Sequence, residues 1–247
     1  MNKKGELTTS QIVTLVILIV GFAIVLIFLF RLNLGQISNK EICHNSVVLN
    51  SKSTLGSTLN CKSSYVCVSG GEDCENFVPD TTMEINASDE NETFKIIADE
   101  MASCWWMFGE GEANFKEYLS YSEGGLGDHC AICSVMKFDS EVQEKLSIID
   151  YDRFYNYLAN TKKDGGETYL KYLYGHFILE EAKLIIRNES LALFGGGAKT
   201  ENKFWILMGV DPELGEEEAD DYVYPVFVNS EEVSSKTSCD NFDLTYP

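Results

Sequence analysis

An uncharged, strongly apolar run from Ile12 to Phe30 constrains this chain more than any other feature. At about 1.5 Å per residue, a helix of this length spans roughly the hydrocarbon core of a bilayer. A cleavable secretory signal usually has a shorter apolar region of about 7 to 15 residues followed by small residues, whereas Arg31 and Leu32 follow this run. The sequence therefore predicts a retained transmembrane helix over residues 12–30, in contact with membrane lipid, after a tail of residues 1–11.

The basic flanks of this helix and the cysteines indicate its orientation. Lys3 and Lys4 precede the run and only Arg31 follows it closely, which is a modest bias towards an N-terminus on the inside. All eight cysteines come after the run, and an even number suits disulfides in an oxidising compartment. We therefore expect a signal anchor that crosses the cell membrane once and holds the C-terminal domain outside. The candidate disulfide residues are Cys43, Cys61, Cys67, Cys74, Cys104, Cys130, Cys133 and Cys239.

The charge balance excludes one class of partner. The chain carries 19 lysine and arginine residues against 39 acidic residues, and its formal net charge of −20 would repel nucleic acid. The inner tail is too short to fold into a signalling module. The expected partner is another surface protein or an envelope component.

The part after the anchor is expected to divide at residue 78. Residues 31–78 are predicted to form a polar stalk that enters a cysteine-rich lobe, because four cysteines lie close together in a loop-rich stretch. Local disulfides among these four are the simplest expectation, and their connectivity stays open. Residues 79–247 are predicted to form an α+β domain, since helical patterns fall in the middle and strand patterns late. Strands are expected over 65–68, 130–138, 191–194, 204–208 and 222–228, the last interrupted by Pro225, and short helices over 152–160 and 167–174.

The clearest helix after the anchor runs from Asn91 to Phe108. Asp89 and Glu92 have capping-box spacing, and apolar residues recur at intervals of three and four after them. Gly109 is expected to end the helix. Aromatic side chains in its last turn are predicted to be core residues, or else an interaction surface, because each can bury on the order of 150 to 250 Å². They are Trp105, Trp106 and Phe108.

The pair Cys130 and Cys133 has three chemical interpretations. Structural disulfides are favoured because the residues after Cys133 alternate like a strand, whereas a redox-active thiolate is usually stabilised at a helix N-terminus. An extracytoplasmic thiol oxidoreductase is an alternative, and a zinc site would need two further ligands at matched spacing. We predict no catalytic, cofactor-binding or metal-ligating residue. The glycines at 195–197 lack the spacing of a phosphate-binding loop and are expected to form a hairpin loop.

Three asparagines begin N-glycosylation sequons, which permit modification of an exported protein. They are Asn86, Asn91 and Asn188.

The N-terminal residues Lys3, Lys4 and Gly5 before an uninterrupted apolar helix resemble the prepilin type of signal found on archaeal pilin-like proteins. This resemblance implies cleavage after Gly5 and a filament in which the apolar helices pack together. The departure is Ser10, at a position where bacterial pilins carry a glutamate and archaeal versions often do not. A pilin-like filament subunit is therefore a second alternative function.

The whole chain resembles single-pass surface proteins of small-genome archaea. The resemblance rests on residues 5–9, 30–33, 41–45, 104–111 and 130–133. It implies an anchored surface protein and brings no known activity, fold or ligand. The leading hypothesis is a membrane-anchored cell-surface protein whose domain has a non-enzymatic binding or structural role.

Overall fold

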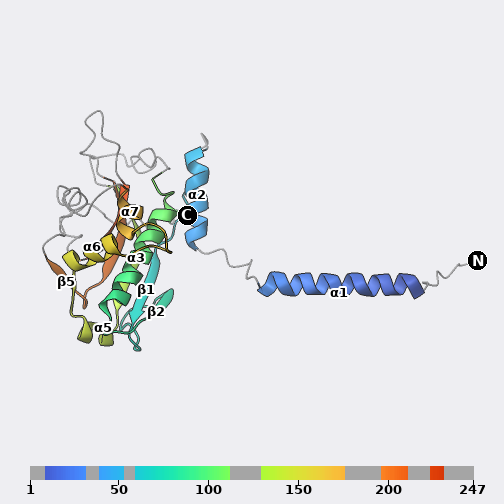
Figure 1. The fold of residues 1–247 in the computed structure, drawn as a ribbon, viewed down its shortest axis with the longest axis horizontal. Coiled ribbons are helices and arrows are strands. Elements are labelled where there is room, and N and C mark those ends of the chain that lie inside the picture. Colours follow the sequence, from blue (N-terminus) through green and yellow to red (C-terminus); the bar gives the residue numbers. More distant parts are fainter. Residues whose placement is uncertain are drawn as a thin grey trace, which may run out of the picture. The chain divides into compact units, whose positions relative to one another are not determined.

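The structure is a computed structural model that describes residues 9–31, 39–52, 59–111, 129–175, 196–210 and 223–230 (Figure 1). It contains two compact units, residues 1–38 and residues 39–247. The first unit holds the helix α1 (Thr9–Arg31). Large apolar side chains of α1 are exposed to solvent, and Ile17 and Leu18 are 67% and 68% exposed. Within the described residues, no helix meets the length and apolarity needed to cross a membrane.

The second unit is built on a mixed five-stranded sheet, which confirms the α+β class. Its strands are β1 (Ser64–Ser69), β2 (Thr81–Glu84), β3 (His129–Phe138), β6 (Phe204–Val210) and β7 (Val223–Asn229). They lie in the order β2-β1-β3-β6-β7. β1 runs parallel to both β2 and β3, and β6 runs antiparallel to both β3 and β7. The predicted strands over 65–68, 130–138, 204–208 and 222–228 correspond to these elements, and the predicted strand over 191–194 lies outside the described residues.

Pro225 does not interrupt its strand. β7 is the last strand of the described sheet, and Pro225 pairs with Met208 in the middle of the ladder with β6. Proline lacks a donor N–H, and an edge strand tolerates that loss because only one side of the strand needs hydrogen bonds.

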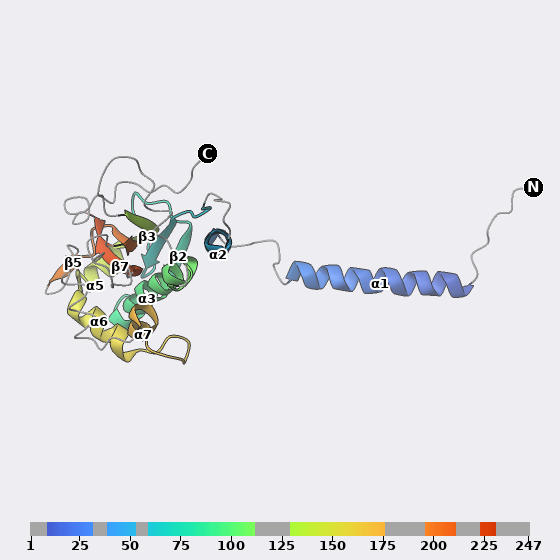
Figure 2. The same cartoon turned by 90° about the horizontal axis from the view of Figure 1, so that it is seen from above.

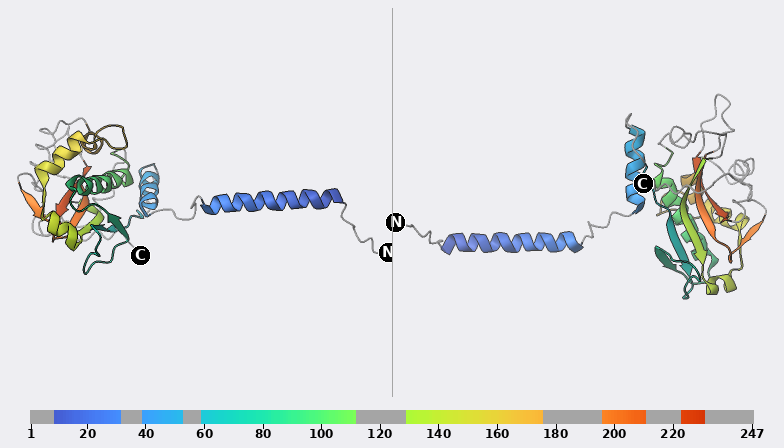
Figure 3. Two further views of the ribbon diagram at one scale, coloured as in Figure 1. Left: turned by 60° about the horizontal axis from the view of Figure 1, so that its bottom comes forward. Right: turned by 180° about the vertical axis from the view of Figure 1, so that it is seen from behind.

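Helices cover one face of this sheet. Figure 2 shows α3 (Glu90–Met107), α6 (Tyr151–Asn160) and α7 (Tyr169–Tyr174) on the same side of the strands, and the right-hand view of Figure 3 shows the strands in front when the domain is seen from behind. A short helix, α5 (Ser140–Lys145), follows β3. β4 (Ile148–Asp150) and β5 (Gly197–Lys199) form a separate antiparallel pair.

Stacked and edge-on phenylalanines join the helices to the sheet. The ring of Phe227 on β7 stacks on Phe204 of β6 at 4.7 Å between centroids, and it also meets Phe154 of α6 at 5.8 Å. Phe154 in turn meets Phe94 of α3 edge-on at 5.4 Å. Such ring pairs add about 0.5–1.5 kcal/mol each beyond the area that they bury. These rings therefore form a connected aromatic cluster within the core, and this cluster links the sheet to α3 and α6.

The helix α3 begins and ends one residue before the predicted bounds of Asn91 and Phe108. The carboxylate of Asp89 accepts a hydrogen bond from the backbone N–H of Asn91, which satisfies one of the free donors at the helix start. Glu92 does not close the capping box on Asp89, because its side chain accepts from the backbone N–H of Asn86 instead. After the helix, Gly109 adopts a positive φ of 78° and its N–H donates to the carbonyl of Trp106.

Two sequence-based expectations about the first part of this unit are corrected. Residues 39–52 form a helix, α2 (Asn39–Lys52), that packs on α3 with Cys43 and Val47 buried, so the domain begins before the expected stalk ends. The chain also does not divide at residue 78, because β1 and β2 pair across that point and β1 continues into the main sheet through β3. Buried apolar side chains and sheet hydrogen bonds therefore make residues 39–78 part of the same core.

Candidate functional site

The helix α3 organises the polar surface of the domain. Phe94, Ile97 and Met101 are at most 2% exposed on its inner face. Lys95 and Asp99 lie on the outer face and border two hollows, one on each side of the helix. The amphipathic pattern that predicts the helix thus also determines which side chains reach the solvent.

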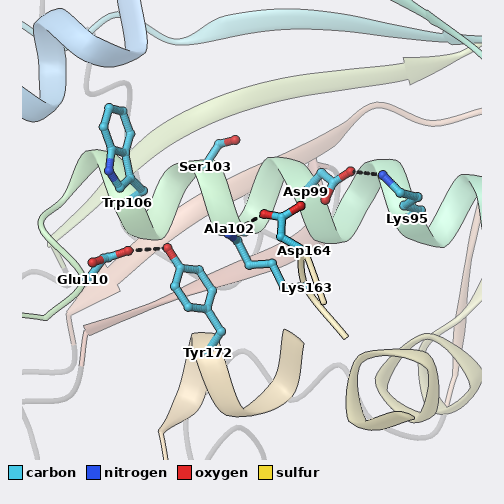
Figure 4. A pocket seen from close by; sticks show the side chains of 9 residues that line it. All are labelled: Lys95, Asp99, Ala102, Ser103, Trp106, Glu110, Lys163, Asp164 and Tyr172. Atoms are coloured by element: carbon cyan, nitrogen blue, oxygen red, sulfur yellow. Dashed lines mark hydrogen bonds and ion pairs between the residues drawn. The ribbon is translucent and has the colours of Figure 1, made fainter. Parts of the chain in front are cut away.

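The first hollow lies between α3 and α7 and has a volume of about 440 Å³ (Figure 4). We call it the α3–α7 hollow. Its side chains come from the outer face of α3, from the turn that follows α3, from the loop before α7 and from α7 itself. They are Lys95, Asp99, Ala102, Ser103, Trp106, Glu110, Lys163, Asp164 and Tyr172.

Asp99 binds two partners at one end of this hollow. Lys95 Nζ lies 2.6 Å from Asp99 Oδ2, and the hydroxyl of Tyr169 donates to Asp99 Oδ1. The hydrogen bond and the charge of Asp99 raise the pKa of Lys95. Burial, together with the bond to Asp99, raises the pKa of Tyr169. Both groups therefore keep their protons at neutral pH and act as hydrogen-bond donors.

Tyr172 lines the hollow from α7 and is held from two sides. Its hydroxyl donates to Glu110, and Lys163 Nζ lies 4.6 Å from the centre of its ring, within cation–π range. Lys163 Nζ is also 3.1 Å from Asp164 Oδ2. Burial and the bond to Glu110 raise the pKa of Tyr172, so the phenol stays neutral. The hollow therefore presents paired donors and acceptors around an aromatic ring, which suits recognition of a polar ligand better than supply of a nucleophile.

The second hollow lies between β2 and α3 and has a volume of about 630 Å³. We call it the β2–α3 groove. Met83 and Ile85 from the strand side and Ile96 from the helix are half-buried and give it an apolar floor. Carboxylates from both walls surround this floor. The groove shares Lys95 and Asp99 with the α3–α7 hollow.

A buried polar network supports α3 at one end of the groove wall. Glu100 is 4% exposed, and both of its oxygens have partners: Lys40 Nζ at 2.7 Å and Ser134 Oγ at 2.6 Å. The hydroxyl of Ser134 lies 2.9 Å from that of Ser64. This chain of contacts joins α2, α3, β3 and β1, so it fixes the position of the helix that borders both hollows.

The cysteines form three disulfides among the described residues. Two of them are local, Cys43–Cys61 and Cys67–Cys74, as expected for the first four cysteines. The third joins Cys104 at the end of α3 to Cys133 in β3. Cys133 is thus bonded across the core and not to Cys130, because its side chain points towards α3. Cys130 is the second residue of β3, and Cys239 lies outside the described residues.

This pairing removes the geometry on which the oxidoreductase interpretation depends. A redox-active Cys-x-x-Cys motif needs its two sulfurs next to each other and one of them accessible. Here Cys133 is bonded to Cys104, and these two residues are 3% and 0% exposed.

The three aromatic candidates at the end of α3 differ in their environment. Phe108 is buried, whereas Trp105 and Trp106 are partly buried against the core. The Trp106 ring stacks on His44 of α2 at 4.1 Å, and His44 Nδ1 donates to the Trp106 carbonyl oxygen at 2.7 Å. Trp106 therefore both holds α2 and lines the α3–α7 hollow.

The sequon asparagines Asn86 and Asn91 are exposed, and Asn188 lies outside the described residues. Within the part of the chain that the structure describes, no three histidine, cysteine or acidic side chains are grouped as a metal site.

Sequence reasoning missed most of the α3–α7 hollow. Tyr172 and Glu110 are 62 positions apart, and Tyr169 and Asp99 are 70 positions apart. Tyr172, Tyr169 and Asp99 belong to no local motif, and Glu110 lies in the stretch 104–111 without a predicted role. Only Trp106 was singled out, through the unusual aromatic density at the end of its helix.

The chain matches no protein-family model, no curated protein and no solved structure with which it was compared.

Proposed function

We propose that this chain is a membrane-anchored cell-surface protein whose disulfide-stabilised α+β domain lies outside the cell and has a non-enzymatic binding or structural role. Residues 12–30 would anchor it in membrane lipid with the N-terminus inside. The domain would contact another surface protein or an envelope component through the outer face of α3.

The observation that carries this proposal is the set of three disulfides in the domain after α1. Cys43–Cys61 attaches α2, Cys67–Cys74 closes the segment between β1 and β2, and Cys104–Cys133 joins α3 to β3. Disulfides persist in oxidising compartments and are rare in reducing ones. Their presence in three separate parts of one domain favours a location outside the cytoplasm.

The composition of α1 supports an anchor. Its described side chains from Ile12 to Ile24 include ten large apolar residues that are each about half exposed or more. An exposed apolar surface of this extent is unfavourable in water and favourable in a bilayer.

The surface beside α3 favours binding over catalysis. The titratable groups in the α3–α7 hollow are paired with one another, and the raised pKa values of Tyr169 and Tyr172 keep both phenols neutral. A phenol that is neutral and already donates to a carboxylate is poorly placed to act as a nucleophile or to exchange a proton with a ligand.

The topology is tested with protease on intact cells that produce the full chain with a C-terminal epitope. We expect the epitope and the domain after residue 38 to be digested while a cytoplasmic marker survives. Full protection of the domain until the membrane is opened would contradict the proposal.

The binding role is tested with a photo-crosslinking amino acid at Ser103, which lines the α3–α7 hollow, and at Glu144, which is exposed on α5 as a matched control. On intact cells, we expect Ser103 to capture one reproducible envelope component that Glu144 does not. Equal capture at both positions, or capture of cytoplasmic proteins alone, would contradict a binding role for this face.

A further inference from the structure

The β2–α3 groove joins an edge strand to an acidic helix face. Thr82, Met83, Glu84 and Ile85 form one wall. The other wall is a single face of α3, because its lining residues from Glu92 to Glu100 recur at helical spacing. We propose that this groove binds an extended, basic segment of a partner protein, which adds to the sheet as a strand beside β2. This inference rests on the proposed function, since it names the class of partner and the place where it binds.

The backbone of β2 is suited to accept another strand. Among the described strands β2 is at the end of the sheet, with β1 on its inner side. The N–H of Ile85 donates to the carbonyl of Ser69 in β1 at 2.8 Å, so the N–H of Ile85 points towards β1. Backbone groups alternate in direction along a parallel ladder, so the N–H groups of Thr82 and Glu84 point away from β1. An edge with outward N–H and C=O groups is a template for strand addition.

The size of the groove fits a short extended segment. The helix wall from Glu92 to Glu100 spans about 12 Å at 1.5 Å per residue. The strand wall from Thr82 to Ile85 spans about 10 Å. At about 3.3 Å per residue, three or four extended residues occupy this length. Alternate side chains of such a segment would reach the apolar floor of the groove, which is the usual source of specificity in strand addition.

Charge selects a basic segment. Within the described residues, Lys95 pairs with Asp99 and Lys40 pairs with Glu100, whereas no lysine or arginine pairs with Glu84 or Glu92. Both of these carboxylates are exposed on the rim of the groove. A second copy of this chain is disfavoured as the occupant because each chain carries a net charge of −20. A partner with lysine or arginine flanking short apolar side chains is complementary.

The preference of the groove for a basic segment is tested with the full chain in a neutral detergent. The ligand is a fluorescent heptapeptide in which lysine and valine alternate. Binding is measured by fluorescence anisotropy for the parent chain, for Glu84→Lys with Glu92→Lys, and for Glu144→Lys with Glu201→Lys. The last variant makes the same change of net charge at exposed positions outside the groove. We expect the groove variant to lose at least about tenfold in affinity and the control less than about threefold. Equal losses would show that the peptide senses only net charge and would overturn the proposal.

Strand addition itself is tested with Thr82→Pro against Thr82→Val. Proline removes the outward N–H, and valine keeps it with a similar side-chain shape. We expect proline to abolish peptide binding and valine to keep it within about threefold, while both variants keep the parent melting temperature within a few degrees. Hydrogen exchange of residues 81–85 should slow on addition of the peptide. Unchanged exchange there, with binding retained by the proline variant, would overturn the proposal.

The two proposals can fail separately. A peptide that does not bind in the groove, together with a partner still captured from Ser103 on intact cells, would overturn the groove and leave the proposed function standing. A domain protected from external protease would overturn the proposed function, whatever the peptide does.

Discussion

At the scale of single residues, buried carboxylates connect distant parts of the domain. Asp139 is 1% exposed at the end of β3. Its Oδ2 accepts hydrogen bonds from Ser69 Oγ and from the N–H groups of Gly70 and Glu72, and its Oδ1 accepts from the N–H of Val142. One side chain thus caps α5 and holds the loop that follows β1.

Asp139 is expected to make the fold sensitive to acid. Burial alone raises the pKa of Asp139, but the four hydrogen bonds outweigh it and the net pKa lies below the usual range. A group whose pKa is lower in the folded chain stabilises the fold fully above its unfolded pKa and loses that contribution as the pH falls through the folded pKa. We therefore expect the free energy of unfolding of the parent chain to decrease as the pH is lowered past about 4. Asp139→Asn should be less stable at pH 7 and should show a shallower decline in acid. An identical acid slope in both chains, measured by urea unfolding, would contradict this role.

Phe108 and Trp105 are expected to differ in their contribution to stability. Phe108 is 2% exposed, whereas Trp105 is partly buried and keeps contact with solvent. Phe108→Ala should cost about 3–5 kcal/mol because it leaves a cavity in the core. Trp105→Ala should cost clearly less, and thermal unfolding of the two variants measures the difference. A larger loss of stability for Trp105→Ala than for Phe108→Ala would contradict this order and would indicate that Trp105 is a core residue.

At the scale of elements, β4 and β5 depend on close backbone packing. A Cβ on Gly197 would lie 2.2 Å from Ile148 Cγ2 and 3.0 Å from the Ile149 carbonyl oxygen, both on the paired strand. The expected glycine hairpin loop is thus partly a strand. Glycine is needed at 197 because any side chain there would push the two strands apart.

Gly197→Ala is therefore expected to destabilise the domain by about 1–3 kcal/mol. Gly196→Ala is the matched control, because a Cβ at 196 meets nothing within 4 Å. We expect the control to stay within about 0.5 kcal/mol of the parent chain in urea unfolding. Similar losses for both variants would mean that chain entropy and not packing sets the cost.

The helix α2 is attached to the domain at three points. The disulfide Cys43–Cys61, the ion pair of Lys40 with Glu100 and the stacking of His44 on Trp106 all join it to residues after it in sequence. Its own pattern is weak, because it is polar over most of its length. Tertiary contacts therefore hold this helix in place.

Removal of the Cys43–Cys61 bridge should release α2. A loop of about this length predicts a loss of about 3 kcal/mol on replacing both cysteines by serine. We also expect trypsin to cleave after Lys40 in this variant. The control replaces Cys67 and Cys74 by serine, which should leave α2 protected because that bridge lies in another part of the domain. Equal protection of α2 in both variants would contradict its dependence on the bridge.

At the scale of the whole molecule, the two units have different chemistry. The first unit is a helix with exposed apolar side chains, and the second is a disulfide-bonded domain with an acidic outer face. This division is the basis for separating an anchoring role from a binding role. It also leaves one alternative use of the first unit, as the packing helix of a filament.

N-terminal sequencing of the native chain distinguishes these uses. For a signal anchor we expect residues before Glu6 to be retained. Processing after Gly5, with Glu6 as the first residue, would instead support the pilin-like subunit. A filament should then appear by electron microscopy of the cell surface, and a chain in which Gly5 is replaced by a bulky residue should lose it.

Local patterns were enough to predict several elements of this fold. Period-two alternation predicted β1 and β3, and apolar spacing of three and four with a capping residue predicted α3, because each of these signals lies within a few consecutive residues. The even number of cysteines after one apolar run likewise predicted disulfides in the domain. What a short window of sequence encodes is which face of an element avoids water.

The partners of those faces were decided only by the tertiary structure. Cys133 is bonded to Cys104 and not to Cys130, Glu100 meets Lys40 across 60 positions, and Tyr172 meets Glu110 across 62. Helix α2 and the position of β2 at the edge of the sheet depend in the same way on contacts between distant segments. The chain's own pattern specifies what each segment must bury, whereas the pairing of segments follows from packing all of them at once around a single core, and that is a property of no segment alone.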